Sequence, residues 1–322
     1  MSKEITILGE QILPGKSYQI KMDIARLHTR TKIEVTVIVS RAKKEGPCVL
    51  ISAGIHGDEV NGIEIVRQLV ANKYNIPDTG MIICVPVVNV FGFIIKTREF
   101  PDGKDLNRSF PGTKNGSLAS KFAHVFMNKI VAHADYCIDF HTGGDDRFNY
   151  PQVRISDDDI DTFNLAKVFG AKFVKYSSQR EKSFRASAVA IGKKVLLYEG
   201  GKSLDINKKI TNVGVTGILN VLDFLGVKKF PVTYNAFKED EQQVVFSNSK
   251  WIRATASGMY RSVILNGAPV KKGDVIGLIT DPYGFFERKI KASVSGSIIC
   301  LNHSPIVNQG DAIAHIAIHG AD

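Results

Sequence analysis

No apolar run in the 322-residue sequence approaches the roughly 20 residues that a membrane-spanning helix needs. The N-terminal Met1-Ser-Lys-Glu4 also lacks the charged and apolar regions of a signal peptide. We therefore expect a cytoplasmic protein with no membrane partner. The hydrophobic content of 44% is typical of a globular protein, and the length allows a large core with a second, smaller domain.

Cysteines are few, and none of the four forms a Cys-x-x-Cys pair. Each lies inside an apolar, strand-like run, as is typical of a buried thiol that serves as a small apolar side chain. Their spacings argue against a zinc–thiolate site. We expect buried, reduced thiols at Cys48, Cys84, Cys137 and Cys300.

Concentrated basic charge is also missing, although the net charge is +10, from 42 basic and 32 acidic residues. The lysines occur as scattered pairs, and neither a helix-turn-helix pattern nor an aromatic RNA-binding signature accompanies them. This distribution argues against a nucleic-acid partner. It favours a solvated surface that attracts small anionic substrates.

The first 45 residues predict a β hairpin. Segments 18–24 and 33–39 alternate apolar and polar residues, and the turn between them is expected near residues 29–31. From about residue 46 to 227, strand-like and helix-like segments alternate, which predicts an α/β sheet.

Two segments of this middle region predict amphipathic helices. Residues 118–134 place their apolar side chains on one side, and residues 213–225 are expected to form the last helix of the α/β domain. His124 and His133 lie on the first of these helices without a ligand partner at helical spacing, so we interpret both as surface histidines.

A polar segment that starts at Pro231 breaks the periodicity, and we place a domain boundary there. The first domain would span residues 1–230 and a C-terminal β domain residues 231–322. In the second domain, residues 270–279 recur in approximate form at 307–316. Such a repeat predicts a small two-fold β sandwich or barrel.

The most informative motif is His56-Gly-Asp-Glu59, which is followed much later by His141. Two imidazoles and one carboxylate are the usual protein ligands of a catalytic zinc ion, with a fourth position left for water. The apolar run 48–54 predicts a buried strand before the motif. The pair thus lies on a strand-to-helix turn, where two side chains three positions apart can converge on one ion.

Other polar side chains follow buried strands in the same way. His141 follows the apolar run 135–140, and Glu199 follows the run 195–198. A third apolar run, 81–88, leads into the loop that contains Arg98, Asn107 and Arg108. Because open α/β sheets build their sites at the carboxyl ends of strands, we expect these groups to meet.

Four motifs carry a resemblance to a known family: Gly54-Ile-His-Gly-Asp-Glu59-x-x-Gly62, Asp105-Leu-Asn-Arg-Ser-Phe-Pro-Gly112, Asp139-Phe-His-Thr-Gly143 and Tyr198-Glu-Gly-Gly201. In this order they resemble the succinylglutamate desuccinylase/aspartoacylase family of the zinc-carboxypeptidase superfamily, over about residues 45 to 227. The resemblance implies an α/β/α fold with a mixed sheet, one zinc ion per chain and hydrolysis of an N-acyl amide on an amino acid. It also implies a carrier-like, all-β C-terminal domain.

The chemistry assigns a role to each candidate residue. His56, Glu59 and His141 would hold the zinc ion, which lowers the pKa of bound water to about 7. Glu199 would act as the general base and later as the acid. Arg98 is the candidate cation for the developing oxyanion.

Other residues would bind the substrate. Asn107 and Arg108 would hold its carboxylate, because a guanidinium binds a carboxylate through two parallel hydrogen bonds. Asp105 would orient their loop. Arg185 and Arg154 are candidates for side-chain specificity, with an ordinary surface arginine as the alternative for each.

The C-terminal β domain resembles the lipoyl and biotinyl carrier fold, but its hairpin at residues 279–286 lacks the lysine signature of a carrier. We expect it to carry no lipoate or biotin and to pack near the mouth of the site, where it would limit access. Support of subunit assembly is the alternative. His303, His315 and His319 are expected to be structural or solvated.

The sequence therefore predicts a zinc-dependent deacylase for a small anionic N-acyl amino acid, of the N-acetyl or N-succinyl type. A metallocarboxypeptidase that acts on a peptide C-terminus is the alternative within hydrolysis, and a non-catalytic binding homologue is the alternative outside it. The acyl group, the amino acid and the oligomeric state, including a possible homo-oligomer, stay open.

Overall fold

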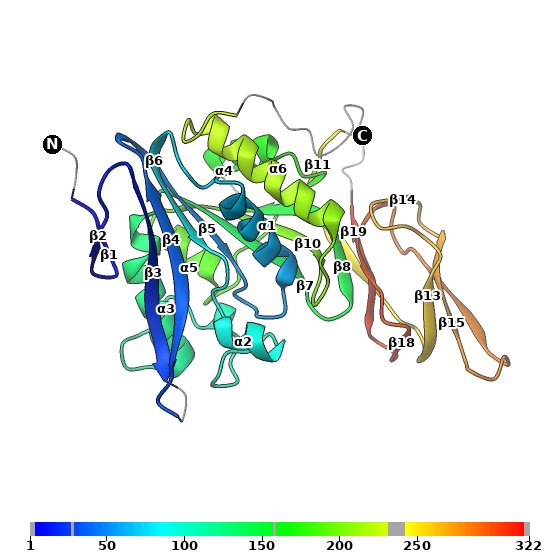
Figure 1. The fold of residues 1–322 in the computed structure, drawn as a ribbon. Coiled ribbons are helices and arrows are strands. Elements are labelled where there is room, and N and C mark those ends of the chain that lie inside the picture. The colour runs from blue at the N-terminus through cyan, green and yellow to red at the C-terminus, as the bar shows by residue number, and fades with distance from the viewer. Residues whose placement is uncertain (1–3, 27–28, 157–158, 231–241, 319–322) are drawn as a thin grey trace.

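The computed structural model describes residues 4–26, 29–156, 159–230 and 242–318. Their strands form a mixed sheet of 13 strands, a separate four-stranded sheet and a short two-stranded ribbon. Along the main path of the large sheet the order is β12-β19-β17-β8-β10-β7-β5-β6-β4-β3. Figure 1 shows this sheet running through the molecule with helices on both of its faces.

Four parallel strands form the centre of the large sheet, in the order β10-β7-β5-β6. Their apolar side chains are buried on both faces, as expected for parallel strands that helices cover. The four buried strands predicted from the sequence are confirmed, with ends that differ by a few residues. Their bounds are Lys44–Ala53 (β5), Thr79–Val85 (β6), Tyr136–Gly143 (β7) and Lys194–Lys202 (β10).

Helices cover the two faces of the sheet and create two apolar cores. Ile65 of α1, Phe169 of α4 and Ile218 of α6 belong to one core, whereas Phe126 of α3 and Phe184 of α5 belong to the other. This arrangement confirms the predicted α/β/α fold. The helices are α1 (Val60–Ala71), α2 (Val90–Ile95), α3 (Leu118–Lys129), α4 (Ile160–Phe169), α5 (Phe184–Ala190) and α6 (Lys208–Phe224).

The ends of two helices differ from the prediction. Helix α3 stops at Lys129, and a separate 3-10 turn, η2 (Val131–His133), follows it. Helix α6 begins at Lys208 rather than at residue 213. The Asn207 side chain caps it by accepting hydrogen bonds from the second and third helical N–H groups, which starts the helix before the apolar pattern becomes visible.

The predicted N-terminal hairpin is confirmed. Strands β3 (Lys16–Arg26) and β4 (Lys32–Arg41) pair antiparallel, and β4 then pairs with β6 at the edge of the central strands. The predicted turn, residues 29–31, lies between these two strands. A short ribbon, β1 (Thr6–Ile7) with β2 (Glu10–Gln11), precedes the hairpin.

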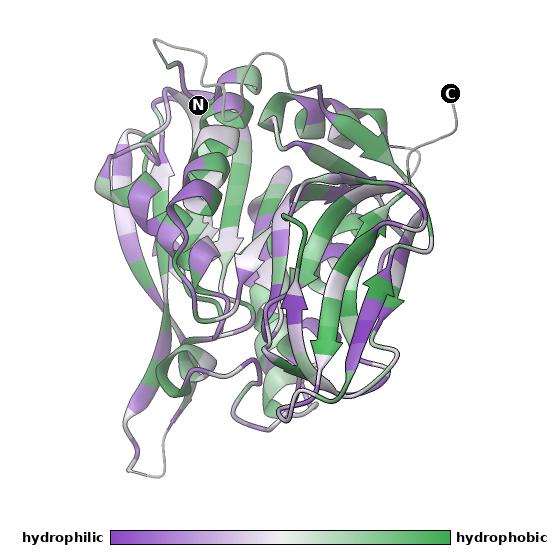
Figure 2. Ribbon diagram, turned by 90° about the vertical axis from the view of Figure 1, so that its right-hand side faces the viewer, coloured by the Kyte–Doolittle hydropathy of each residue, from purple (hydrophilic) through white to green (hydrophobic). Residues whose placement is uncertain are grey.

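The C-terminal region is all β, as predicted. Hydrophobic and hydrophilic residues alternate along its strands (Figure 2), and the buried apolar side chains meet between two sheets. The bounds are β12 (Ser249–Arg253), β13 (Gly258–Ser262), β14 (Pro269–Val270), β15 (Val275–Thr280), β16 (Glu287–Lys291), β17 (Gly296–Asn302), β18 (Ile306–Val307) and β19 (Ala312–Ala317).

The predicted internal repeat appears in the backbone. Gly258 and Gly296 occupy equivalent positions, with φ values of 154° and 155°, and a Cβ atom at either would collide with a backbone carbonyl oxygen. In each repeat a two-residue strand, β14 or β18, precedes a long one, β15 or β19. The two halves of the region are therefore built alike.

The C-terminal region joins the large sheet directly, which the sequence did not indicate. Strand β17 pairs antiparallel with β8 (Arg147–Ile155), and β8 pairs antiparallel with β10. On a side branch, β9 (Phe173–Tyr176) pairs parallel with β8 and with β11 (Val244–Phe246). The boundary predicted after residue 230 adjoins residues 231–241, which lie outside the described residues, so it stays a prediction.

Two predictions from the composition can be compared with the structure. All four cysteines are buried and free, as predicted. Within the described ranges, no helix combines the length and the apolar character that crossing a membrane requires.

Candidate active site

The strand-to-helix turn after β5 carries two of the predicted metal ligands. His56 lies in this turn, and Glu59 is the residue directly before α1. His141 lies near the end of β7, the strand beside β5 in the sheet. Because β5 and β7 are parallel, their carboxyl ends bring the three side chains to the same edge of the sheet.

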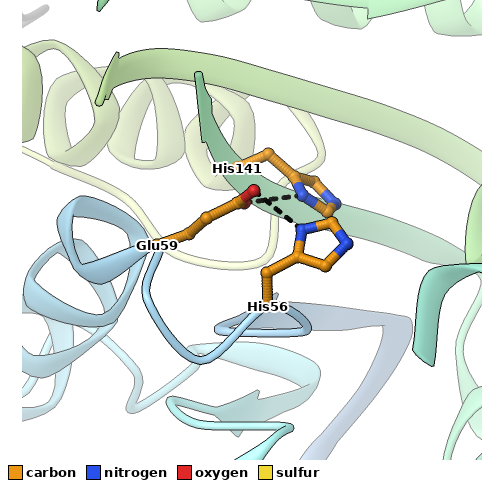
Figure 3. A group of neighbouring side chains, drawn as sticks. All are labelled: His56, Glu59 and His141. Atoms are coloured by element: carbon orange, nitrogen blue, oxygen red, sulfur yellow. Dashed lines mark hydrogen bonds and ion pairs between the residues drawn. The ribbon is translucent and has the colours of Figure 1, made fainter. Parts of the chain in front are cut away.

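These three side chains form a compact, buried cluster (Figure 3). The Nδ1 atom of His56 lies 2.7 Å from Oε1 of Glu59, and Nδ1 of His141 lies 2.9 Å from Oε2. One ligand atom from each residue lies within 4.8 Å of the others, so the cluster could hold a metal ion. The structure therefore brings together the three residues predicted from the sequence.

A second carboxylate contacts the other ring nitrogen, Nε2, of each imidazole. Nε2 of His141 lies 2.8 Å from Oδ2 of Asp139. The other oxygen of this carboxylate, Oδ1, accepts a hydrogen bond from the hydroxyl of Ser52. Nε2 of His56 lies 3.2 Å from Oδ1 of Asp105. Carboxylates in this position orient metal-binding histidines and leave the other ring nitrogen to face the ion.

The charges of the cluster fit a divalent cation. With neutral imidazoles, the carboxylates of Glu59, Asp105 and Asp139 and the guanidinium of Arg98 leave a net charge of minus two in a largely buried space. Burial by itself raises the pKa of Glu59, but His56 and His141 hold it well below its usual range. Glu59 is thus ionised. Although burial opposes the shift, the surrounding carboxylates raise the pKa of His56 and His141, and both imidazoles would lose their protons on binding a metal ion.

Arg98 lies at the cluster rather than at a distance from it. Its Nη1 atom is 3.3 Å from Oε1 of Glu59, and its Nη2 atom donates to Oδ2 of Asp105 at 2.9 Å. Asp105 therefore holds both His56 and Arg98, in addition to its position before the substrate loop. The predicted orienting role of Asp105 agrees with this geometry, whereas the catalytic role of Arg98 stays a prediction.

The loop with Asn107 and Arg108 is held rigidly. The Asp105 side chain accepts a hydrogen bond from the Asn107 N–H at 2.8 Å and caps the 3-10 turn η1 (Leu106–Arg108). Oδ1 of Asn107 accepts a hydrogen bond from the Phe184 N–H at 2.8 Å. The amide NH2 group of Asn107 is thereby left as the donor for a ligand.

Glu199 reaches the same space from β10. Its Cα is paired with that of His141 across the parallel β10–β7 ladder. The Asn149 side chain donates to its Oε2 at 2.7 Å, and Nη1 of Arg154 lies 3.1 Å from its Oε1. Both partners come from β8, so the neighbouring antiparallel strand orients this carboxylate.

One cavity of about 610 Å³ contains in its lining all nine residues predicted to bind metal, to bind substrate or to act in catalysis. They are His56, Glu59, Arg98, Asn107, Arg108, His141, Arg154, Arg185 and Glu199. Arg185 is buried, and its Nη2 atom donates to the carbonyl oxygen of Ser178 at 2.9 Å. The structure thus places every predicted residue at one site, although it does not test their roles.

Other residues of the lining escaped the sequence reasoning. Asn149 and Lys175 come from strands that carry no motif. Trp251, Cys300 and His315 come from the C-terminal region, which therefore lies at the site as predicted. No local signal identifies these residues, because their place depends on which strands pair.

The other predicted surface or structural histidines can be placed. His124 is half-buried on α3 beside Asn128, and His303 stacks on Phe148. His133 ends the turn η2. His315 is buried in the cavity wall rather than solvated, and His319 lies outside the described residues.

The model of the succinylglutamate desuccinylase/aspartoacylase catalytic domain matches residues 45–225, more than half of the chain. The chain belongs to the succinylglutamate desuccinylase/aspartoacylase family. The match agrees with the range of about 45 to 227 over which the motifs carry the resemblance. This family assignment covers the central strands and every predicted site residue.

Individual relatives of the family extend the similarity over most of the chain. An N-alpha-acetyl-L-2,4-diaminobutyric acid deacetylase from Halomonas elongata is 29% identical over 302 residues, which cover 88% of this chain and 85% of the relative. A succinylglutamate desuccinylase/aspartoacylase structure from Rhodobacter sphaeroides has a TM-score of 0.81 at 24% identity, and 95% of this chain and 96% of that chain are covered.

A product-bound structure of the ectoine utilization protein EutE (DoeB) from Ruegeria pomeroyi has a TM-score of 0.82 at 22% identity. It covers 99% of this chain and 100% of that chain. Because these comparisons extend beyond the catalytic domain, the β region at the C-terminus belongs to the shared fold.

Proposed function

We propose that this member of the family is a zinc-dependent deacylase, which hydrolyses the amide bond of a small N-acyl amino acid. The observation that carries the proposal is the convergence of a buried His56, Glu59 and His141 cluster with Glu199 in one cavity. The family assignment supports a hydrolase that acts on amide bonds.

The proposed metal is zinc, which His56, Glu59 and His141 would hold. Two nitrogen donors and one oxygen donor are typical of catalytic zinc sites. A zinc ion at this place would supply Lewis-acid chemistry, which polarises an amide carbonyl and lowers the pKa of water.

Glu199 is the proposed general base and acid. Its Oε2 atom accepts a hydrogen bond from Asn149 and its Oε1 atom forms an ion pair with Arg154, which fixes the direction of the carboxylate toward the cavity. In this position it takes a proton from the attacking water and delivers it to the nitrogen of the leaving amine. Both transfers use one carboxylate, so the base is restored after each turnover.

The cationic side chains share the remaining tasks. Arg98 is fixed by Asp105 and stabilises the negative charge that develops on the carbonyl oxygen. The NH2 group of Asn107 and the guanidinium of Arg108 bind the amino-acid carboxylate. Burial lowers the pKa of Arg108, with nearby Arg180 and Arg98 contributing, and a bound carboxylate would offset that repulsion.

The proposed substrate carries an acetyl or succinyl group on the amino-acid nitrogen. The name of the Halomonas relative supports the acetyl form, and the name of the family supports the succinyl form. A set of N-acetyl and N-succinyl amino acids, tested with the full-length chain after zinc loading, distinguishes them.

The measurement is the release of free amino acid, and Glu199→Gln is the control for contaminating activity. We expect release that depends on added zinc and disappears in the variant. Cleavage of blocked peptides at their C-terminus instead would indicate a carboxypeptidase. Binding without release would indicate a non-catalytic homologue.

A further inference from the structure

Strand β8 is irregular beside the proposed general base. Glu199 of β10 is paired with Gln152 of β8. The next pair along this ladder joins Gly201 to Asn149. Between these two pairs β10 contains one residue and β8 contains two, which makes this part of β8 a β-bulge. One of the two bulge residues is Pro151, which has no N–H to give to the ladder and is typical of such a position.

The bulge decides on which face of the sheet the side chain of Asn149 lies. In a regular strand successive side chains alternate between the two faces, so Asn149, three positions before Gln152, would lie on the face opposite to it. The extra residue reverses this alternation. Asn149 therefore shares a face with Glu199, and both side chains line the cavity. Bulges next to active sites re-aim side chains in this way.

The backbone around Asn149 is held from both sides. Asn149 is paired with Gly201 of β10 on one side and with Cys300 of β17 on the other. The residue is 5% exposed, so solvent does not compete for its side chain. Its amide group therefore has a fixed origin from which to contact the carboxylate of Glu199.

The contact itself has only one chemical reading. An ionised carboxylate can only accept hydrogen bonds, so the NH2 group of Asn149 is the donor to Oε2 of Glu199, at 2.7 Å. This donor uses one lone pair of Oε2. When Glu199 takes a proton from water, the NH2 group cannot accept a hydrogen bond from it. The proton must then lie on a lone pair that faces the cavity, from which it can reach the leaving nitrogen.

We propose that Asn149 is a positioning residue for Glu199, which holds Oε2 so that the transferred proton stays on the cavity side of the carboxylate. This inference rests on the proposed function and adds to it a residue that no motif of the sequence marks. Asn149 acts through Glu199 and takes no part in the bond-making steps. Because a neutral amide is the donor, it orients the carboxylate without adding a charge.

The first test removes the donor at nearly constant volume. Asn149→Leu should lower kcat by roughly 10–100-fold, because a small misplacement of a proton-transferring group is costly to the rate. KM should stay close to that of the wild type. The assay uses the full-length, zinc-loaded chain with the N-acetyl or N-succinyl amino acid that the wild type hydrolyses fastest.

A second variant separates the donor from the shape of the side chain. Asn149→Asp keeps the shape but replaces the donor with an acceptor, so it should lose at least as much kcat as Asn149→Leu. A role in packing alone predicts the opposite order, with the isosteric Asp the better tolerated. Asn149→Gln keeps the NH2 group on a longer side chain and should restore part of the rate.

The matched control removes a similar hydrogen bond from the same strand. The NH2 group of Asn266 donates to the carbonyl oxygen of Phe148, the residue before Asn149, at 2.7 Å. Asn266→Leu should leave kcat and KM unchanged. Zinc content and thermal unfolding, measured on every variant, report whether the chain folds, and the isosteric Asp decides alone if Asn149→Leu does not.

A double-mutant cycle tests whether Asn149 acts through Glu199. In the Glu199→Gln background, Asn149→Leu should cause little further loss of kcat, because residues that act as a unit are not additive. Multiplied losses, a loss confined to KM, or wild-type turnover in Asn149→Asp would each overturn the positioning role and leave the deacylase proposal standing. Failure of the wild-type chain to hydrolyse any substrate of the set would instead contradict the proposed function, and the inference would fall with it.

Discussion

The two edges of the large sheet are extended in the same way but serve different purposes. At one edge, strands β3 and β4 add an antiparallel hairpin whose inner side chains, such as Val37, are buried in the core. At the other edge, β17, β19 and β12 add antiparallel strands, and Trp251, Cys300 and His315 face the cavity. Within the described residues, no side chain of the hairpin lines that cavity.

The difference follows from where the proposed catalytic groups lie in the strand order. Glu199 lies on β10, and only β8 separates β10 from the C-terminal strands. Three strands, β7, β5 and β6, separate β10 from the hairpin. A strand contributes to a site only if its face reaches the bound molecule. The strands added at the hairpin edge therefore contribute to the core, whereas those added at the C-terminal edge contribute to the cavity wall.

The largest effect is expected in the centre of the sheet, between the two edges. Glu199→Gln should reduce turnover by roughly 10²–10⁴, because the amide cannot accept the proton of the attacking water. Zinc content and the free energy of unfolding should stay close to those of the wild type. Turnover is measured by the release of amino acid, and zinc content by elemental analysis. Loss of metal in the variant would show that Glu199 is a ligand instead.

Arg108 should give the next largest effect, on substrate affinity. Arg108→Ala removes the cation that binds the amino-acid carboxylate, which typically costs on the order of 2–5 kcal/mol when the partner charge is buried. The loss should appear with N-acyl amino acids and be much smaller with their C-terminal amides. KM measured on both forms decides, and an equal loss on both would assign Arg108 a folding role.

A matched pair of variants tests the comparison of the edges itself. Val37→Ala at the hairpin edge should lower the free energy of unfolding by about 2 kcal/mol, because it leaves a cavity in the core. It should leave KM unchanged. Trp251→Ala at the other edge should raise KM several-fold while costing less stability, because this indole is 37% exposed.

Denaturant unfolding and KM, measured on both variants, give the answer. The comparison of the edges would be wrong if Val37→Ala raised KM as much as Trp251→Ala does. It would also be wrong if Trp251→Ala affected stability alone.

The smallest effect is a pH dependence of substrate binding near Lys175, which lines the cavity. Burial, with Arg154 contributing, lowers the pKa of Lys175 to about 8, while Glu199 opposes the shift and Arg180 adds to it. The ammonium is charged below this pH and neutral above it. Affinity for an anionic substrate should therefore be full below pH 8 and decline as the pH rises through it.

The measured quantity is KM for an anionic N-acyl amino acid divided by KM for its amide, between pH 7 and 9. His315 stays neutral over this range and adds no change of its own. A ratio that is constant over this range, or that decreases as the pH rises, would exclude Lys175 as the binding cation.

The local parts of the site could be predicted because each is encoded in a short segment. The His56 and Glu59 pair, His141 and Glu199 each follow an apolar run, and parallel strands bring such positions to one edge. The central strands and most helices could be predicted for the same reason. The start of α6 could not, because the Asn207 cap lies outside the apolar pattern.

The remaining parts of the site depend on strand pairing between distant segments. Nothing near Asn149 or Arg154 indicates that β8 lies between β10 and β17, although this order places both residues against Glu199. The same holds for His315, whose position in the cavity wall requires two successive antiparallel pairings. Pairing of this kind is fixed by the whole sheet and not by a local pattern.

The direct β17–β8 pairing also has a consequence for the order of events during synthesis. His56, Glu59, His141 and Glu199 leave the ribosome well before β17 and β19. The proposed metal ligands and base can thus come together while one wall of the cavity is still missing. If the proposed function holds, premature termination before β17 would yield a protein that binds metal but lacks the wall formed by Cys300 and His315.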